Sequence, residues 1–183
     1  LDTTETKFET QTLVFPPSIL QVFMEQIANA IDQKNDCPDA TTQFRFAFNV
    51  DNGEASVMNN GRSIPVAVVR NSAGQPQWCP EMLCTGFRSS SNHNKTEGAQ
   101  RITLGAHGIG LKALTAMSKK MRVECVDIER GLYYAQDILD CNTRIMPPTV
   151  VTIDKKNKPP TELKNGGTRF TYILDYDFYR SDG

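Results

Sequence analysis

The chain has 183 residues and a net charge of −1, with 39% hydrophobic and 22% charged residues. This length and composition are typical of one globular domain with its own core. The near-neutral charge argues against a domain whose main task is neutralising nucleic-acid phosphates, and no run approaches the roughly 18 apolar residues of a membrane span. We expect one domain over residues 1–183, inside the cell in cytoplasm or nucleus, without a membrane partner.

The five cysteines show neither CxxC spacing nor a histidine at zinc-ligand spacing. We interpret them as reduced thiols, mostly in the core. The chain starts at Leu1 rather than methionine and without a signal-like segment. We therefore expect it to be a piece of a longer protein.

A first helix is predicted from about Ile19 to Lys34, because Pro17 and Ser18 supply a helix start. Within it, polar residues recur at i, i+4 and i+7 and share one face: Glu25, Asn29 and Asp32. The apolar residues that we expect to bind the opposite face to a sheet are Leu20, Phe23, Ile27 and Ile31. The polar row would then border a cleft, and a solvated helix face is the alternative.

The rest of the chain alternates strand and helix patterns. "QFRFAFNV" and "EASVMN" flank a "DNG" turn and predict a hairpin. A short helix near Pro80 to Phe87 and a second long helix, roughly Gly108 to Lys120, follow. Four strands come next, "MRVECVDI", "LYYAQDIL", "TVVTID" and "TRFTYIL". This order predicts an α+β fold, an α/β two-layer sandwich with a mixed, mostly antiparallel sheet and its helices on one face.

Two further stretches point to chemistry. In "NNGRSIPV", Asn59 to Val66, a glycine and a proline after a strand form a tight bend, although a simple turn explains the same pattern. In "LGAHGIGLKAL", Leu104 to Leu114, glycines precede a helix and would let a phosphate approach its N-terminal N–H groups. Either stretch alone is a weak signal.

In this order, the helix row, the bend and the glycine run resemble the three nucleotide-binding boxes of the GHKL ATPase superfamily, which has the Bergerat fold. Within it, the chain most resembles the ATPase domain of type IIA DNA topoisomerases. "NNGRSIPV" is similar to their N-N-G-[KR]-G-I-P-V, and "SSSN" at 89–92 to the T-S-S-N of eukaryotic and viral members. The resemblance runs from about Phe15 to Phe178, and we group the chain with viral or phage members, acting in the host cell.

The resemblance implies a role for each residue. Glu25 matches the general base for attack on the γ-phosphate, and Asn29 matches the Mg²⁺ ligand. Asp32 would orient neighbouring side chains or the purine, and Asn59 would accept from the adenine amino group. The remaining implied ATP contacts are Gly61, Arg62, Ile64, Pro65, Ser90, Ser91, Asn92, Gly105, Ala106, His107, Gly108, Ile109, Gly110, Leu111 and Lys112. Residues 93–104 would form a flexible lid.

The chain departs from the family pattern at several positions. Ser63 stands where the family has Gly, Gln33 replaces a second Asn, and Ala106 with His107 replaces Arg-Asn, which removes one cation. The family's catalytic lysine comes from the following transducer domain, which this sequence does not include. Binding of ATP is thus a firmer expectation than fast hydrolysis.

Three functions fit the resemblance. The first is the ATPase gate of a topoisomerase that forms a homodimer on ATP binding, drives strand passage, and contacts DNA through other domains. The second is another GHKL ATPase of chaperone or chromatin type. The third is a nucleotide-dependent switch module with little turnover.

Overall fold

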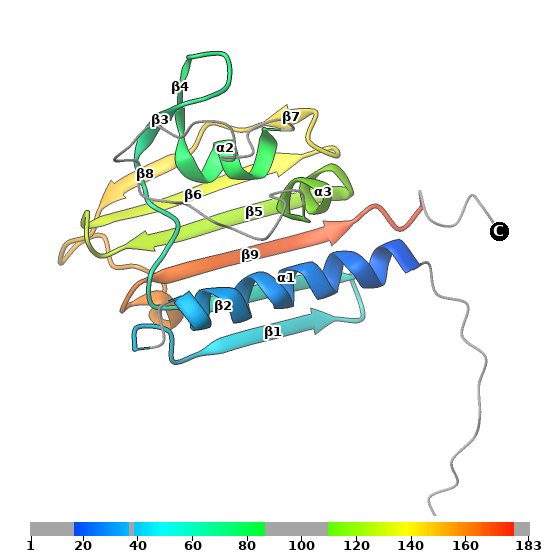
Figure 1. Cartoon of the computed structure of the whole chain (residues 1–183), viewed down its shortest axis with the longest axis horizontal. Helices are drawn as coiled ribbons and strands as arrows, with labels where there is room; N and C mark the ends of the chain where they lie inside the picture. The colour runs from blue at the N-terminus through cyan, green and yellow to red at the C-terminus, as the bar shows by residue number, and fades with distance from the viewer. Residues whose placement is uncertain (1–16, 37–38, 87–109, 178–183) are drawn as a thin grey trace, which may run out of the picture.

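A computed structural model describes residues 17–36, 39–86 and 110–177 (Figure 1). Its main sheet has the strand order β1-β2-β9-β5-β6-β7, with β8 also paired to β6, and all of these pairs are antiparallel. The strands of this sheet are β1 (Phe44–Asn49), β2 (Glu54–Asn60), β5 (Ser118–Asp127), β6 (Leu132–Leu139), β7 (Arg144–Ile145), β8 (Thr149–Thr152) and β9 (Gly167–Leu174).

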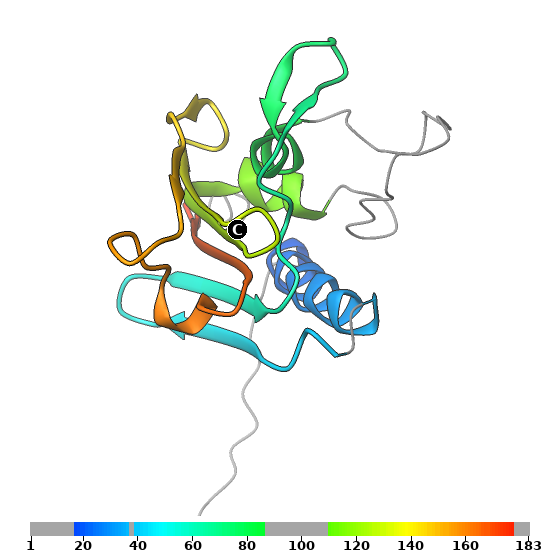
Figure 2. The same cartoon turned by 90° about the vertical axis from the view of Figure 1, so that its left-hand side faces the viewer.

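The helices lie on one face of this sheet, as Figure 2 shows edge-on. They are α1 (Pro17–Asp36), α2 (Cys79–Thr85) and α3 (Gly110–Ala116). α1 contacts α3 and β2, while α3 also contacts α2 and β5. The predicted two-layer α+β architecture with helices on one face is confirmed.

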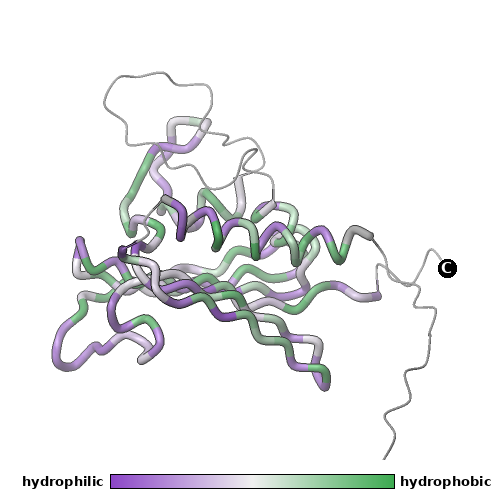
Figure 3. The backbone as a smooth tube through the Cα atoms, turned by 60° about the horizontal axis from the view of Figure 1, so that its bottom comes forward, coloured by the Kyte–Doolittle hydropathy of each residue, from purple (hydrophilic) through white to green (hydrophobic). Residues whose placement is uncertain are grey.

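The core forms between the helices and the central strands. Apolar and polar residues alternate along parts of these strands (Figure 3), and the apolar residues on the helix side are buried. Met58 and Val126 are buried in a smaller cluster with Leu163. Large apolar side chains of these strands with 1% exposure or less on the helix side include Met121, Val123, Tyr134, Ile138, Tyr172 and Leu174. Burial of a large apolar side chain contributes about 1.5–3 kcal/mol, so this layer holds the helices on the sheet.

The cysteines of the described residues are all free thiols, as expected. Cys79, Cys84 and Cys125 are fully buried, and Cys141 is half-buried. Burial raises the pKa of Cys79 to about 11 and raises that of Cys125 well above its ordinary value. These thiols therefore stay protonated and act as small core residues. Cys37 lies outside the described residues.

The buried face of α1 differs from the predicted one. Its buried residues are Ile19, Val22, Gln26 and Ala30. Leu20 is 54% and Ile31 is 52% exposed, so the prediction that they bind α1 to the sheet is wrong. Phe23 is half-buried, and its ring meets those of Phe46 and Tyr172 at 5.9 and 6.1 Å. The apolar pattern of the sequence does not indicate this buried face, because the residue at its centre is the polar Gln26.

The second long helix is shorter than predicted, because α3 ends at Ala116. The hydroxyls of Thr115 and Ser118 donate to the carbonyls of Leu111 and Leu114, and Ser118 already pairs with β9. Such hydroxyls compete for helical carbonyls and favour helix termination. The predicted start at Gly108 lies outside the described residues.

Several small elements had no clear sequence signal. β3 (Val68–Arg70) and β4 (Pro76–Trp78) form a hairpin that projects from the fold, and η2 (Thr161–Leu163) is one 3-10 turn within the predicted polar loop.

No helix in the described ranges is long and apolar enough to cross a membrane.

Candidate functional site

The first and third stretches meet where α1 passes the start of α3. A Cβ built on Gly110 would lie 2.5 Å from Oε2 of Glu25 and 3.1 Å from its Cβ. Glu25 also accepts a hydrogen bond from Nε2 of Gln21 at 3.3 Å. The backbone of α3 can come this close to the Glu25 carboxylate only because residue 110 has no side chain.

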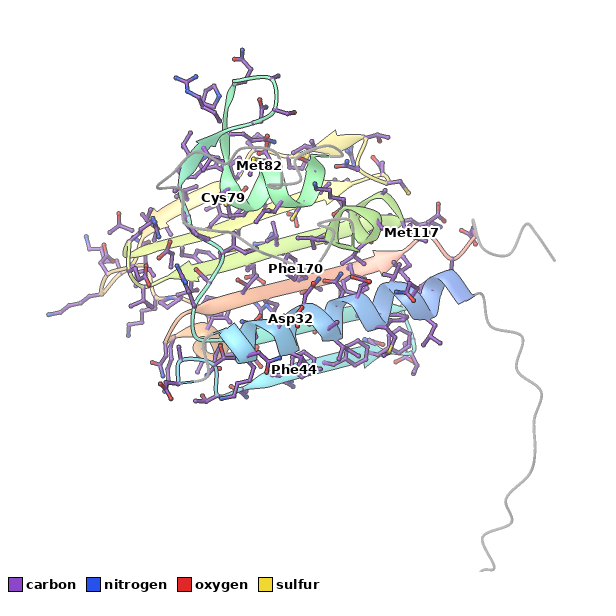
Figure 4. All side chains as sticks on the ribbon, viewed as in Figure 1. Asp32, Phe44, Cys79, Met82, Met117 and Phe170 are labelled. Carbon is purple, nitrogen blue, oxygen red and sulfur yellow. The ribbon has the colours of Figure 1, made fainter. Side chains whose placement is uncertain are left out.

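The polar row on α1 runs from this junction toward solvent. Glu25 and Asn29 are half-buried, whereas Asp32, labelled in Figure 4, is exposed. Asp32 thus fits the solvated-face alternative, whereas Glu25 and Asn29 are partly covered by the fold. Glu25 and Asn29 lie one turn apart, so a carboxylate and an amide border the same space.

Asn59 and Asn60 end strand β2 with different surroundings. Asn59 lies two residues after the buried Val57 and on the same face of β2, so it faces the helices; its Nδ2 donates to the Asn60 carbonyl at 3.4 Å. No group in the described part of the chain donates to its side-chain oxygen. That oxygen is an available acceptor on the helix side of the sheet.

The neighbouring Asn60 instead ties two segments together. Its Oδ1 accepts from the backbone N–H groups of Thr42 and Gln43 at 2.9 and 2.7 Å, and its Nδ2 donates to the Thr42 hydroxyl. It fixes the chain entering β1. Adjacent identical residues therefore have a structural and a potential ligand-binding role.

The bend after β2 depends on Gly61. Its φ of +99° is strained for residues with a side chain, and a Cβ there would lie 2.6 Å from the Ala40 carbonyl. Its N–H donates to the Gly166 carbonyl at 3.1 Å. The bend is thus packed against the chain that enters β9.

Ser63 fits this bend without strain. The φ of Ser63 is not positive, and its hydroxyl donates to the Ile64 carbonyl at 2.9 Å. Ordinary backbone geometry therefore accommodates the departure from the family's glycine at this position.

The segment after the bend is held by side chains. The Ile64 N–H donates to Oγ1 of Thr168 at 3.1 Å, and the Val66 N–H donates to Oδ2 of Asp127 at 2.8 Å. Ile64 and Val66 are buried, and Pro65 between them is half-buried. Neither Thr168 nor Asp127 was singled out from the sequence, because nothing local marks a residue that bonds to so distant a segment.

A pocket of about 510 Å³ opens beside the bend. One wall comes from the bend and the other from the turn between β5 and β6. Its lining residues are Ala40, Gly61, Arg62, Ser63, Pro65, Asp127, Ile128, Glu129, Arg130 and Asn165. Arg62 is exposed, so its guanidinium lies at the surface beside this pocket.

The described part of the glycine-run stretch is the N-terminal turn of α3. Gly110 is half-buried, while Leu111 and Lys112 are buried. Burial lowers the pKa of the Lys112 amino group from its ordinary value. The predicted contacts Ser90, Ser91, Asn92, Gly105, Ala106, His107, Gly108 and Ile109, and the predicted lid, lie outside the described residues.

No group of three or more His, Cys, Asp or Glu side chains in the described ranges could hold a metal ion by itself. A cation at this site would need ligand oxygens from elsewhere, and polyphosphate oxygens are suitable ligands for Mg²⁺. A single amide oxygen such as that of Asn29 is compatible with this kind of site.

Known proteins similar in sequence to this chain are DNA topoisomerases, although no protein-family model matches it. It is 26% identical to DNA topoisomerase 2 of Candida albicans over 155 residues, which cover 82% of this chain and 10% of that protein. It is 26% identical to DNA topoisomerase 2 of Acanthamoeba polyphaga mimivirus over 165 residues, which cover 90% of this chain and 12% of the relative. The chain spans about a tenth of the length of these curated relatives.

A solved structure shows the same similarity in three dimensions. It contains the ATPase and transducer domains of DNA topoisomerase II from Balamuthia mandrillaris, with a TM-score of 0.72 and 30% sequence identity. The match covers 88% of this chain and 38% of that chain. The sheet, the helices and their order are thus those of an ATPase domain.

Proposed function

Since this chain belongs to the family of type II DNA topoisomerases, we propose that it binds ATP with Mg²⁺ where α1, the end of β2 and the start of α3 meet. The observation that carries the proposal is the approach of Gly110 to Glu25, with space for no side chain between them. It joins the predicted catalytic carboxylate to the helix start predicted to receive the phosphates. Backbone N–H groups at helix starts favour anions.

Asn59 would bind the base. Its side-chain oxygen lies on the helix side of β2 and has no donor among the described residues, so it can accept from the amino group of adenine. We expect the bend at Gly61 and the side chain of Ile64, which follow Asn59 in the chain, to supply the apolar contacts to the ring. We therefore expect adenine to be preferred to guanine, which presents a carbonyl at the same ring position.

Asn29 and Glu25 would serve the phosphate end. The amide oxygen of Asn29 would be the protein ligand of Mg²⁺, which supplies charge neutralisation on the phosphate oxygens when bound. Glu25 makes no ion pair in the described part of the chain and would accept a proton from the attacking water. Lys112 would add positive charge near the start of α3.

The activity of the longer protein is part of the proposal. We infer that ATP binding drives dimerisation and DNA strand passage in an intracellular enzyme that contacts DNA through other domains. The names of the relatives support this inference, although the chain spans about a tenth of their length. A switch module with little turnover is the second candidate, because the family's catalytic lysine is supplied by the next domain.

Calorimetry tests the binding proposal directly. A non-hydrolysable ATP analogue should bind the 183-residue chain in the presence of Mg²⁺, and more weakly with EDTA. Phosphate release by a longer protein that includes the transducer domain then separates the two candidates. A chain that binds no adenine nucleotide under either condition would refute the proposal.

A further inference from the structure

The Ile64–Val66 segment belongs to no strand, yet both of its backbone N–H groups are bonded. Pro65 has no N–H, so Ile64 and Val66 supply the only donors of the segment. Their acceptors are side chains of two adjacent strands, Thr168 on β9 and Asp127 at the end of β5. Side chains from the sheet thus hold a segment that the backbone ladder does not.

Asp127 is the charged member of this pair. Its side chain is only 5% exposed. Oδ2 accepts from the Val66 N–H at 2.8 Å and from Nη1 of Arg130 at 3.0 Å, and Oδ1 accepts from the Arg130 backbone N–H at 3.1 Å. One buried carboxylate therefore links the segment after the Gly61 bend to the turn between β5 and β6.

We infer that Asp127 is a positioning residue for the nucleotide site, an inference that rests on the proposed function. The Asn59–Val66 stretch carries the base-binding groups, and Asp127 fixes its far end by a hydrogen bond to an ionised acceptor, which is stronger than a neutral one. Val66 is 1% exposed, so without this acceptor its N–H would be buried and unsatisfied.

The effect on nucleotide affinity depends on the fraction of molecules in which the Ile64–Val66 segment is in place. A nucleotide binds the fraction of molecules in which the segment is in place, and its apparent affinity falls in proportion to that fraction. Asp127 does not need to contact ATP for this effect. The effect would appear as weaker binding with little change in the fold of the sheet.

The chain offers a matched control at Glu124. Glu124 lies on the same strand and is similarly buried. Its carboxylate accepts hydrogen bonds from Nε of Arg169 and from the Tyr133 hydroxyl, each at 2.7 Å. Residues 124 and 127 point to opposite faces of β5, so Glu124 lies away from the helices. Its removal costs stability without touching the Ile64–Val66 segment.

The test compares Asp127→Ala, Asp127→Asn and Glu124→Ala. Titration calorimetry with an Mg²⁺–ATP analogue gives affinity, and hydrogen exchange gives protection of the Val66 amide. Asp127→Ala should weaken binding about tenfold or more and expose the Val66 amide to exchange. Asp127→Asn keeps an acceptor oxygen and should restore most of both, while Glu124→Ala should bind normally.

The possible results separate the two proposals. Normal affinity in Asp127→Ala, or an equal loss in Glu124→Ala, would overturn the positioning role. An unchanged chain that binds no nucleotide would overturn the proposed function and the inference with it. If Asp127→Ala does not fold, exchange in the unchanged chain decides: bound nucleotide should slow exchange at Val66 more than at Ala135 on β6, and equal slowing would refute the role.

Discussion

The carboxylate of Glu25 occupies the space that any side chain at residue 110 would need, with Oε2 at 2.5 Å from an ideal Cβ on Gly110. In an ordinary helix, alanine is about 1 kcal/mol better than glycine. Here the replacement forces Glu25 or α3 to move. The two residues are therefore coupled, although they come from separate helices.

Gly110→Ala should destabilise the chain by about 1–3 kcal/mol, because overpacking outweighs the gain in helix propensity. Urea unfolding measures this change. In a Glu25→Ala background the added methyl meets only the Cβ of residue 25, so the same replacement should cost less. Equal costs in both backgrounds would show that the two side chains are not coupled.

Glu25→Gln should preserve nucleotide binding but lower turnover by about 100-fold or more, because the amide keeps the shape and cannot accept the proton. The measurement is phosphate release by a longer protein that includes the transducer lysine, with calorimetry as the binding control. Normal phosphate release would mean that Glu25 is no base and would favour the switch module.

Asn29→Ala should abolish or greatly weaken Mg²⁺-dependent nucleotide binding, because it removes the amide oxygen that the resemblance assigns as the Mg²⁺ ligand. Calorimetry with Mg²⁺ and with EDTA measures the metal-dependent part. Asp32→Ala is the control, since Asp32 is exposed and should change affinity little. Binding that keeps its full Mg²⁺ dependence in Asn29→Ala would contradict the ligand assignment.

ATP should bind more tightly than GTP by about 1–3 kcal/mol, the usual cost of an unmatched buried hydrogen-bonding group. Asn59→Ala should remove most of this preference. Asn60→Ala should instead lower stability and keep the preference, because Asn60 bonds to Thr42 and Gln43. Competition binding of the two nucleotides gives the ratio, and equal affinities in the unchanged chain would exclude Asn59 as the base-recognition residue.

Acid should weaken the fold through Glu124. Burial alone would raise its pKa, but hydrogen bonds from Arg169 and Tyr133 and the charges of Arg169 and Arg122 outweigh burial and hold the pKa below its ordinary value of 4.5. A lowered carboxylate pKa contributes stability that is present above the unfolded-state pKa and is lost as pH falls through the folded-state pKa. Unfolding free energy should therefore fall less steeply below about pH 4.5 in Glu124→Gln than in the unchanged chain; parallel curves would contradict this.

The local patterns of the sequence determined most of the secondary structure. Alternating Phe44, Phe46 and Phe48 before the "DNG" turn predict β1 and β2, and the polar spacing of Glu25 and Asn29 predicts one face of α1. Periodicity depends only on residues close together in the sequence, so it can be recognised without knowledge of the fold. The order of the three stretches was enough to indicate the superfamily.

Only the tertiary structure decided which residues meet. Nothing near Gly110 in the sequence marks Glu25 as its neighbour, and nothing near Val66 marks Asp127 as the acceptor of its N–H. The choice of Gln26 over Ile31 for the buried side of α1, and the different roles of Asn59 and Asn60, likewise depend on the surfaces that the sheet and α3 present. The physical reason is that burial and hydrogen bonding are satisfied over the whole packed molecule, whereas periodicity constrains each element only by itself.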